Sequence, residues 1–165
     1  TLRLAQALAR SRPEGRIVLI GPLFDPPSAP LPANVELRPA VAHPEALALA
    51  AGFDVGIVPF RVTALTGCVD PLKYYEYRGL GLPVLATSFG ELRHKSDPAL
   101  LLAEPGCDLD AAIDRALALR SRAAPPPLDE WSWTSRFAPL QAWLTSLGRP
   151  LGSGIVRAEP ACTLS

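Results

Sequence analysis

Short apolar runs alternate with longer segments of helical periodicity along most of this chain. Runs such as "GRIVLIGP" (15–22) and "PVLATS" (83–88) are short and continuous, which is typical of strands buried on both faces. The segment "DLDAAIDRALALRSR" (108–122) instead carries its apolar residues on one helical face. The pattern predicts strands at 15–22, 34–39, 54–60, 83–88 and 99–105, and helices at 1–11, 43–52, 70–80, 108–122 and 130–147.

Strands that alternate with helices predict an α/β fold, with a Rossmann-like parallel sheet and helices on both faces. Ligands of such sheets bind outside the carboxyl ends of the strands. That edge is expected at Gly21-Pro22, at Pro39 to Val41, at Pro59 to Asp70 and at Ser88 to Glu91. We predict one domain over residues 1–148 and an unstructured tail over 149–165.

The last predicted helix carries an apolar stripe that is expected to pack in a core or an interface. The stripe comprises Trp133, Phe137, Leu140, Trp143, Leu144 and Leu147. A helix lying on a membrane surface would need a basic opposite face, and Arg136 is the only cation of this segment.

Composition narrows the classes of function. With 48% hydrophobic and 19% charged residues among 165, the chain can form a core. Its 16 Lys+Arg balance its 16 Asp+Glu, which argues against a nucleic-acid partner, so any anion site must be local. Cys68, Cys107 and Cys162 lie far apart without metal-ligand spacing, and His43 and His94 are isolated in the sequence. No apolar run is long enough to span a bilayer, so we expect a cytoplasmic protein, or one peripheral to the inner face of the membrane.

The stretch "DPLKYYEYRGLGLPVLAT" (70–87) holds the candidate chemistry. Asp70 suits the N-cap of a helix, and Pro71 suits its first position. Lys73 in the opening turn opposes the helix dipole, which favours carboxylates there by about 0.3–1 kcal/mol. Backbone N–H groups, dipole and ammonium together would suit a phosphate.

Glu76 follows one turn later on the same face, where a carboxylate can accept hydrogen bonds from vicinal hydroxyls. A phosphate site beside a hydroxyl acceptor describes the ribose-diphosphate part of a nucleotide. The competing interpretation is that Lys73 and Glu76 form an exposed ion pair while the neighbouring tyrosines cover the core, and the residues alone favour neither.

The segments "FDVGIVPF" and "DPLKYYEYRGLGLPVLAT" resemble the donor-binding, C-terminal half of GT-B glycosyltransferases, in which "fDvgllPf" precedes "sPlKlyEYlAaGkPVvaT". "RIVLIGP", "NVELRP" and "WSWTSRFAPLQAWL" also fall in the family's order. The resemblance covers residues 1 to about 147. It implies transfer of a sugar from a nucleotide-diphospho-sugar, of UDP or GDP type, to a glycan or lipid-linked acceptor. It also implies a partner N-terminal GT-B domain.

By this resemblance Lys73 lies near the diphosphate and Glu76 holds the ribose, and we predict both as catalytic residues. The nucleobase edge corresponds to Pro39 to Val41. The predicted donor-binding set is Gly21, Pro39, Val41, Cys68, Val69, Asp70, Leu72, Lys73 and Glu76.

The chain also departs from the family. Cys68 stands where many retaining relatives carry a glutamate that touches the sugar, so neither the sugar nor the stereochemical outcome follows. The family's first strand, expected to be central in the sheet, is not found before the helix at 1–11. "DLD" (108–110) spells a manganese motif of another glycosyltransferase fold, but the start of a helix favours a role at the dipole. We expect no metal and no other cofactor. A non-catalytic nucleotide-binding or regulatory module, and a structural α/β domain without a ligand, remain the alternatives.

Overall fold

A computed structural model describes all residues except 1, 25–26, 28–29, 105 and 148–165. The predicted tail at 149–165 lies outside the described residues. The chain divides into two compact units, residues 1–126 and 127–165, which are described separately below.

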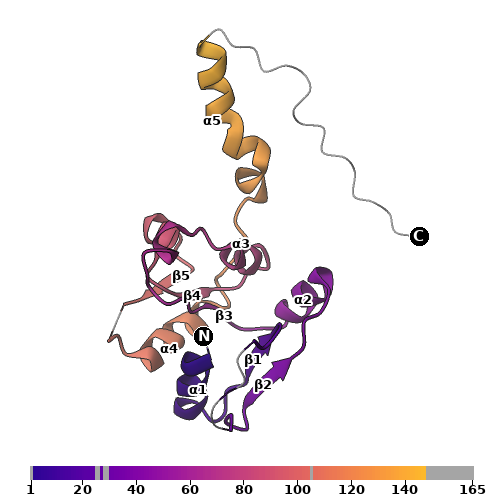
Figure 1. The fold of residues 1–165 in the computed structure, drawn as a ribbon, viewed down its shortest axis with the longest axis vertical. Coiled ribbons are helices and arrows are strands. Elements are labelled where there is room, and N and C mark those ends of the chain that lie inside the picture. Colours follow the sequence, from indigo (N-terminus) through magenta and orange to yellow (C-terminus); the bar gives the residue numbers. More distant parts are fainter. Residues whose placement is uncertain (1, 25–26, 28–29, 105, 148–165) are drawn as a thin grey trace, which may run out of the picture. The chain divides into compact units, whose positions relative to one another are not determined.

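Each predicted strand and helix is present, which confirms the α/β class (Figure 1). The strands are β1 (Ile17–Ile20), β2 (Val35–Arg38), β3 (Gly56–Val58), β4 (Val84–Thr87) and β5 (Leu100–Ala103). The α-helices are α1 (Leu2–Ser11), α2 (His43–Ala50), α3 (Leu72–Gly79), α4 (Leu109–Leu119) and α5 (Trp133–Ser146). Three 3₁₀ helices, which the pattern did not predict, are η1 (Thr66–Cys68), η2 (Gly90–His94) and η3 (Leu128–Trp131).

The strands form two small parallel sheets flanked by helices, which agrees with the predicted Rossmann-like α/β fold, although the strands are divided between the two sheets. β1 pairs with β2 from Ile17 opposite Val35 to Ile20 opposite Arg38. β4 lies between β3 and β5 in the second sheet. Within the described residues, no strand joins β1 to β3, and each of these strands is hydrogen-bonded to a strand on one side only.

Helices cover both faces of the three-stranded sheet. Ile57 of β3 and Leu85 of β4 pack on a core cluster that also contains Leu8 of α1 and Ile113 of α4. On the opposite face, a Cβ at Gly56 would lie 2.3 Å from the Tyr77 ring, so glycine lets β3 approach α3 closely. Neighbouring residues of a strand point to opposite faces, and therefore α1 and α4 lie on one side and α3 on the other.

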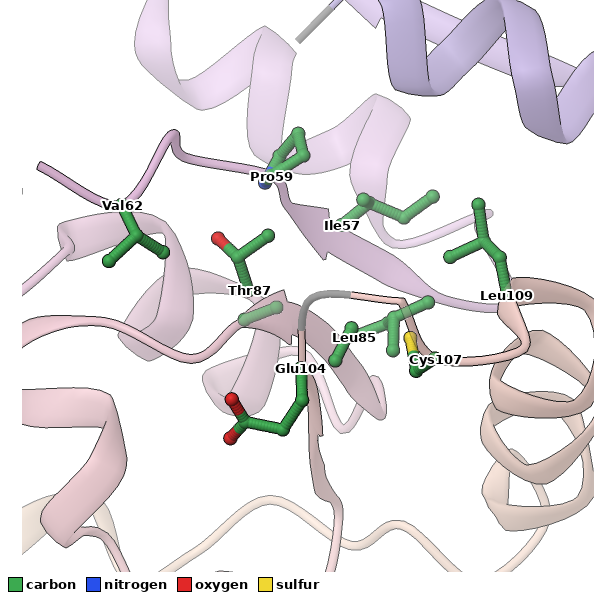
Figure 2. A pocket seen from close by; sticks show the side chains of 10 residues that line it. Ile57, Pro59, Val62, Leu85, Thr87, Glu104, Cys107 and Leu109 are labelled. Atoms are coloured by element: carbon green, nitrogen blue, oxygen red, sulfur yellow. The ribbon is translucent and has the colours of Figure 1, made fainter.

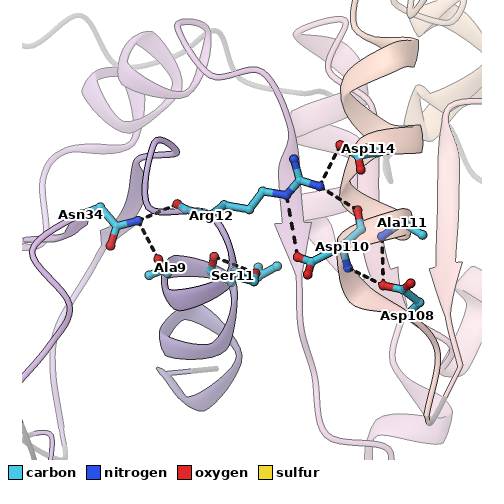
Figure 3. Close-up of polar contacts among 9 residues, drawn as sticks. Ala9, Ser11, Arg12, Asn34, Asp108, Asp110, Ala111 and Asp114 are labelled. Carbon is cyan, nitrogen blue, oxygen red and sulfur yellow. Dashed lines mark hydrogen bonds and ion pairs between the residues drawn. The ribbon is translucent and has the colours of Figure 1, made fainter.

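Polar contacts tie α1 both to the two-stranded sheet and to α4 (Figure 3). The Arg12 guanidinium lies 2.7 Å from the Asp114 carboxylate and donates to the Asp110 carbonyl. The Asn34 amide, just before β2, donates to the carbonyls of Ala9 and Arg12. The segment at the end of α1 therefore connects the two-stranded sheet to α4, although β1 and β3 are not hydrogen-bonded to each other.

The two sheets point in the same direction. Ile17, which opens β1, and Val55, just before β3, pack on the same core cluster, to which no residue of β2 belongs. At the other end, His43 after β2 contacts Glu76 of the helix after β3. The carboxyl ends of both sheets thus lie at one edge, and β1 is the strand of the first sheet that contacts the core cluster of the second.

Hydrogen exchange will test the interruption between β1 and β3. β4 is paired on both sides, so all its amide protons should exchange slowly, whereas every second amide of β1 and β3 should exchange fast. The measurement is native-state exchange followed by NMR, with β4 as the internal control. Uniform protection along β1 and β3 would contradict the two-sheet arrangement.

In the second unit, α5 runs through Pro139 and begins with Ser132 as its cap, whose hydroxyl accepts from the Ser135 amide. Five side chains of the predicted stripe are exposed there: Trp133, Phe137, Leu140, Trp143 and Leu147. Packing of the stripe in a core is therefore not found, and an interface role stays a prediction. Within the described parts of the chain, no helix combines the length and apolar character needed to cross a membrane.

Candidate functional site

The start of α3 differs from the prediction that Asp70 caps it. The helix begins at Leu72, Pro71 takes the cap position, and no side chain caps the helix. The Asp70 carboxylate instead accepts from the Tyr75 hydroxyl at 2.5 Å and lies 3.3 Å from the Lys95 ammonium. The Tyr75 hydrogen bond and the Lys95 ion pair together hold the carboxylate away from the helix end.

Lys73, Glu76 and His43 form the polar cluster at this helix start. Lys73 Nζ donates to Glu76 Oε2 at 2.6 Å, and His43 Nε2 lies 3.2 Å from Glu76 Oε1. The Glu76 side chain is 20% exposed, whereas that of Lys73 is 53% exposed. Partial burial by itself would raise the pKa of Glu76, but the hydrogen bonds from Lys73 and His43 outweigh it and hold that pKa below its usual value.

The cluster contains both predicted catalytic residues and one residue that the sequence did not identify. Lys73 lies in the opening turn of α3, as predicted, and its ion pair with Glu76 is the contact that the competing interpretation expected. His43 was treated as isolated because its partner lies 33 residues away. Its position just after the expected nucleobase edge was the only signal that could have drawn attention to it.

The cluster lies at the carboxyl ends of the strands, beside the interruption between the two sheets. The helix start that carries Lys73 follows β3, and His43 follows β2. Because the first N–H groups of a helix lack intrahelical acceptors and carry a partial positive charge, an anion here would meet both these groups and the Lys73 ammonium.

The other predicted donor-binding residues lie on the segments that follow these strands. Gly21 has φ +144° and donates its amide to the Arg38 carbonyl, which ties it to the end of β2. Pro39 is exposed and Val41 is half-buried between β2 and α2. Leu72 and Cys68 are exposed, and Val69 is half-buried. The structure brings only Lys73 and Glu76 of the predicted set into direct polar contact with each other.

The loop that carries Cys68, Val69 and Asp70 packs closely against the backbone at Gly90. The Glu91 amide donates to the Val69 carbonyl, and Gly90 has φ +49°. A Cβ at Gly90 would lie 2.1 Å from the Val69 carbonyl oxygen. Only glycine allows this close approach. Gly90 therefore determines the position of the loop that leads into the candidate site.

A buried polar network anchors the other end of α3. Arg78 is 4% exposed and donates to the Asp97 carboxylate at 2.7 Å, while its other nitrogens donate to the carbonyls of Leu82 and Ala124. The Tyr74 hydroxyl also donates to Asp97. Burial by itself would raise the pKa of Asp97, but hydrogen bonds from the Ala99 amide, Arg78 and Tyr74 lower it overall.

An apolar hollow of about 230 Å³ lies at the carboxyl ends of β3, β4 and β5 (Figure 2). Its lining includes Ile57, Leu85 and Leu109, which belong to the face covered by α1 and α4. The Lys73–Glu76 pair belongs to α3 on the opposite face. The hollow and the polar cluster are therefore separate features, and among the described residues that line the hollow none has a cationic side chain that could pair with a phosphate.

In the described residues, His, Cys, Asp and Glu side chains do not gather in threes or more as metal ligands. Asp108 of the "DLD" motif caps α4 by accepting from the amides of Asp110 and Ala111, at 3.0 and 3.1 Å (Figure 3). The motif therefore acts at a helix start, as predicted. The expectation that no metal takes part stays a prediction.

Comparisons with protein-family models, with curated proteins and with solved structures gave no match to this chain. The resemblance to GT-B glycosyltransferases therefore remains a hypothesis from the sequence motifs, to be weighed with the geometry of the Lys73–Glu76 cluster.

Proposed function

We propose that this chain is the donor-binding half of a glycosyltransferase that takes a sugar from a nucleotide-diphospho-sugar. The observation that carries the proposal is the position of Lys73 and Glu76 on one face of α3, at the carboxyl ends of the strands and beside the interruption between the two sheets. Ligands of open α/β sheets bind outside the carboxyl ends of the strands. The interruption between β1 and β3 also lies where the resemblance expects a missing central strand.

In this proposal the diphosphate binds at the first turn of α3 beside Lys73, and the ribose hydroxyls donate to Glu76. The nucleobase rests against the segment Pro39 to Val41. During transfer the bond between the sugar's anomeric carbon and the diphosphate oxygen breaks, a hydroxyl oxygen of a glycan or lipid-linked acceptor forms the new bond, and the proton of that hydroxyl passes to the released nucleoside diphosphate. Negative charge then grows on the leaving diphosphate, where a fixed donor such as Lys73 contributes about 2.7–4 kcal/mol in comparable sites.

Several segments that lead away from the carboxyl ends of the strands carry exposed apolar side chains, which supports a surface that is covered in the working enzyme. They belong to the segments after β1 and β3 and to the start of α3: Leu23, Phe24, Phe60, Val62, Leu65 and Leu72. Exposed large apolar residues that cluster at a ligand edge are typical of binding surfaces. A second, acceptor-binding GT-B domain is the partner that the proposal requires.

Lys73→Ala is expected to weaken UDP or GDP binding about tenfold or more, because a hydrogen bond to a charged group contributes about 1.5–3 kcal/mol. Isothermal calorimetry on the purified chain measures this. Arg93→Ala is the matched control, since Arg93 is an exposed cation on η2. Unchanged affinity in Lys73→Ala would reject the phosphate assignment.

Glu76→Ala tests the ribose assignment separately. It should weaken binding of the ribonucleotide but affect an analogue without ribose hydroxyls much less. Equal loss for both ligands would show that Glu76 does not contact the hydroxyls.

The non-catalytic alternative is favoured by one observation, the exposed Cys68 at the position of the sugar-contacting glutamate. An activity assay on the full-length gene product distinguishes the two: nucleotide binding without sugar transfer would support the binding module. UDP or GDP at 100 times its Kd should raise the free energy of unfolding by about 2.7 kcal/mol, which thermal unfolding would detect. Such stabilisation would exclude the structural domain without a ligand.

A further inference from the structure

Both carboxylate oxygens of Glu76 are already occupied within the chain. Oε2 accepts from Lys73 at 2.6 Å, and Oε1 lies 3.2 Å from the ring nitrogen of His43. A carboxylate offers about four lone-pair sites, so these two donors leave further sites open, but a hydroxyl that arrives at Oε2 has to share that oxygen with the Lys73 ammonium.

The two partners differ in how readily they can leave. Lys73 has a long, rotatable side chain that is 53% exposed, and its ammonium is a mobile point charge suited to phosphate. His43 is also exposed, at 63% of its side chain, so the difference lies in length: it reaches Glu76 from the start of α2, a different element, through a short side chain with two rotatable bonds. An arriving diphosphate offers Lys73 a more highly charged acceptor, whereas His43 has no such reason to move.

We propose that Lys73 masks the hydroxyl-binding oxygen of Glu76 until a diphosphate draws the ammonium away, and that His43 is the positioning residue that holds the carboxylate in place. This inference rests on the proposed function. The phosphate and ribose parts of the ligand then bind cooperatively, because capture of the first exposes the acceptor for the second. The site would select intact nucleoside diphosphates against nucleosides that carry no phosphate.

The charges around Glu76 are consistent with this exchange. When Lys73 turns to the phosphate, the carboxylate keeps the imidazole N–H on Oε1 and offers Oε2 to a hydroxyl. The helix start supplies further partial positive charge to the phosphate. Loss of Lys73 therefore has opposite effects on the two parts of the ligand, which no purely structural role of the ion pair would produce.

The experiment is an NMR titration of Lys73→Met with pyrophosphate, with uridine and guanosine, and with UDP and GDP. Pyrophosphate and the nucleoside diphosphates should bind at least about tenfold more weakly, since one charge-assisted bond is lost. The matching nucleoside should bind about threefold more tightly, the size expected for release of an exposed ion pair. Arg93→Ala should leave all affinities unchanged.

His43 is tested by a pair of variants. His43→Ala should weaken nucleoside diphosphate binding about fivefold while leaving pyrophosphate binding unchanged, in the range of one lost hydrogen bond. His43→Gln keeps an N–H donor on a side chain of similar reach and should restore most of the affinity. Equal affinity in wild type and His43→Ala would overturn the positioning role.

The outcomes separate this inference from the proposed function. If wild type binds neither UDP nor GDP, both fail together. If wild type binds the nucleoside diphosphate and Lys73→Met weakens it but leaves the nucleoside unchanged or weaker, the donor site stands and the masking is overturned.

Discussion

Asp97→Asn should destabilise the unit at residues 1–126 by about 3–5 kcal/mol, the range found when one member of a buried ion pair is removed. Asparagine keeps the size of the side chain and an oxygen for the Ala99 amide, but it leaves the Arg78 guanidinium with no counter-charge at its 2.7 Å contact. Arg78 is 4% exposed, so water cannot replace the carboxylate. Urea unfolding followed by circular dichroism measures the loss.

An exposed pair provides the control for this prediction. Glu36 on β2 accepts from Arg16 and Arg38 in a solvated position, and Glu36→Gln should therefore change the free energy of unfolding much less than Asp97→Asn does. The double variant Asp97→Asn with Arg78→Met should recover part of the loss, because no charge is then left buried. A loss below 1 kcal/mol in Asp97→Asn would show that water reaches Arg78.

The same pair predicts how stability changes with pH. The folded pKa of Asp97 is depressed, so its contribution is complete above the unfolded pKa of about 3.9 and disappears as the pH falls through the lower folded value. Wild type should therefore lose more stability than Asp97→Asn on acidification below about pH 4. Urea unfolding of both proteins at pH 7 and at pH 3 measures this. The difference between their free energies of unfolding should be smaller at pH 3.

The elements could be predicted from the sequence because their signals are local. Continuous apolar runs and helical spacing depend on neighbours within one element, and each predicted strand and helix is present. The number of sheets could not be predicted in this way, since pairing of β1 with β3 depends on what lies between strands that are far apart in sequence. The 3₁₀ helix η2 was missed for a similar reason: it is held by contacts of Gly90 and Glu91 with Val69.

The candidate site shows the same division. Lys73 and Glu76 lie three residues apart, so helical geometry alone placed them on one face. His43 reaches the cluster from another helix, which no spacing rule shows. Asp70 occupies the position of a helix cap in the sequence, but its carboxylate contacts Tyr75 and the distant Lys95 instead, and no local pattern shows the Lys95 contact.

Gly90→Ala should cost about 3 kcal/mol in stability and also weaken nucleotide binding. The new Cβ would lie 2.1 Å from the Val69 carbonyl oxygen and 3.0 Å from that of Thr66, and both are backbone atoms that move only with their loop. Overpacking costs about 1–3 kcal/mol, and alanine at a φ of +49° adds strain. The loop that must move carries Cys68, Val69 and Asp70, which lead into the Lys73 helix start.

Gly67→Ala is the matched control, because it lies in the same loop and a Cβ there has no atom within 4 Å. It should change stability by no more than about 0.5 kcal/mol and leave UDP or GDP affinity unaltered. Calorimetry and thermal unfolding on both variants separate the two effects of Gly90. If Gly90→Ala unfolds at a lower temperature but binds nucleotide with wild-type affinity, the loop contributes to stability alone. The donor site then depends on α3 and His43 and not on the position of this loop.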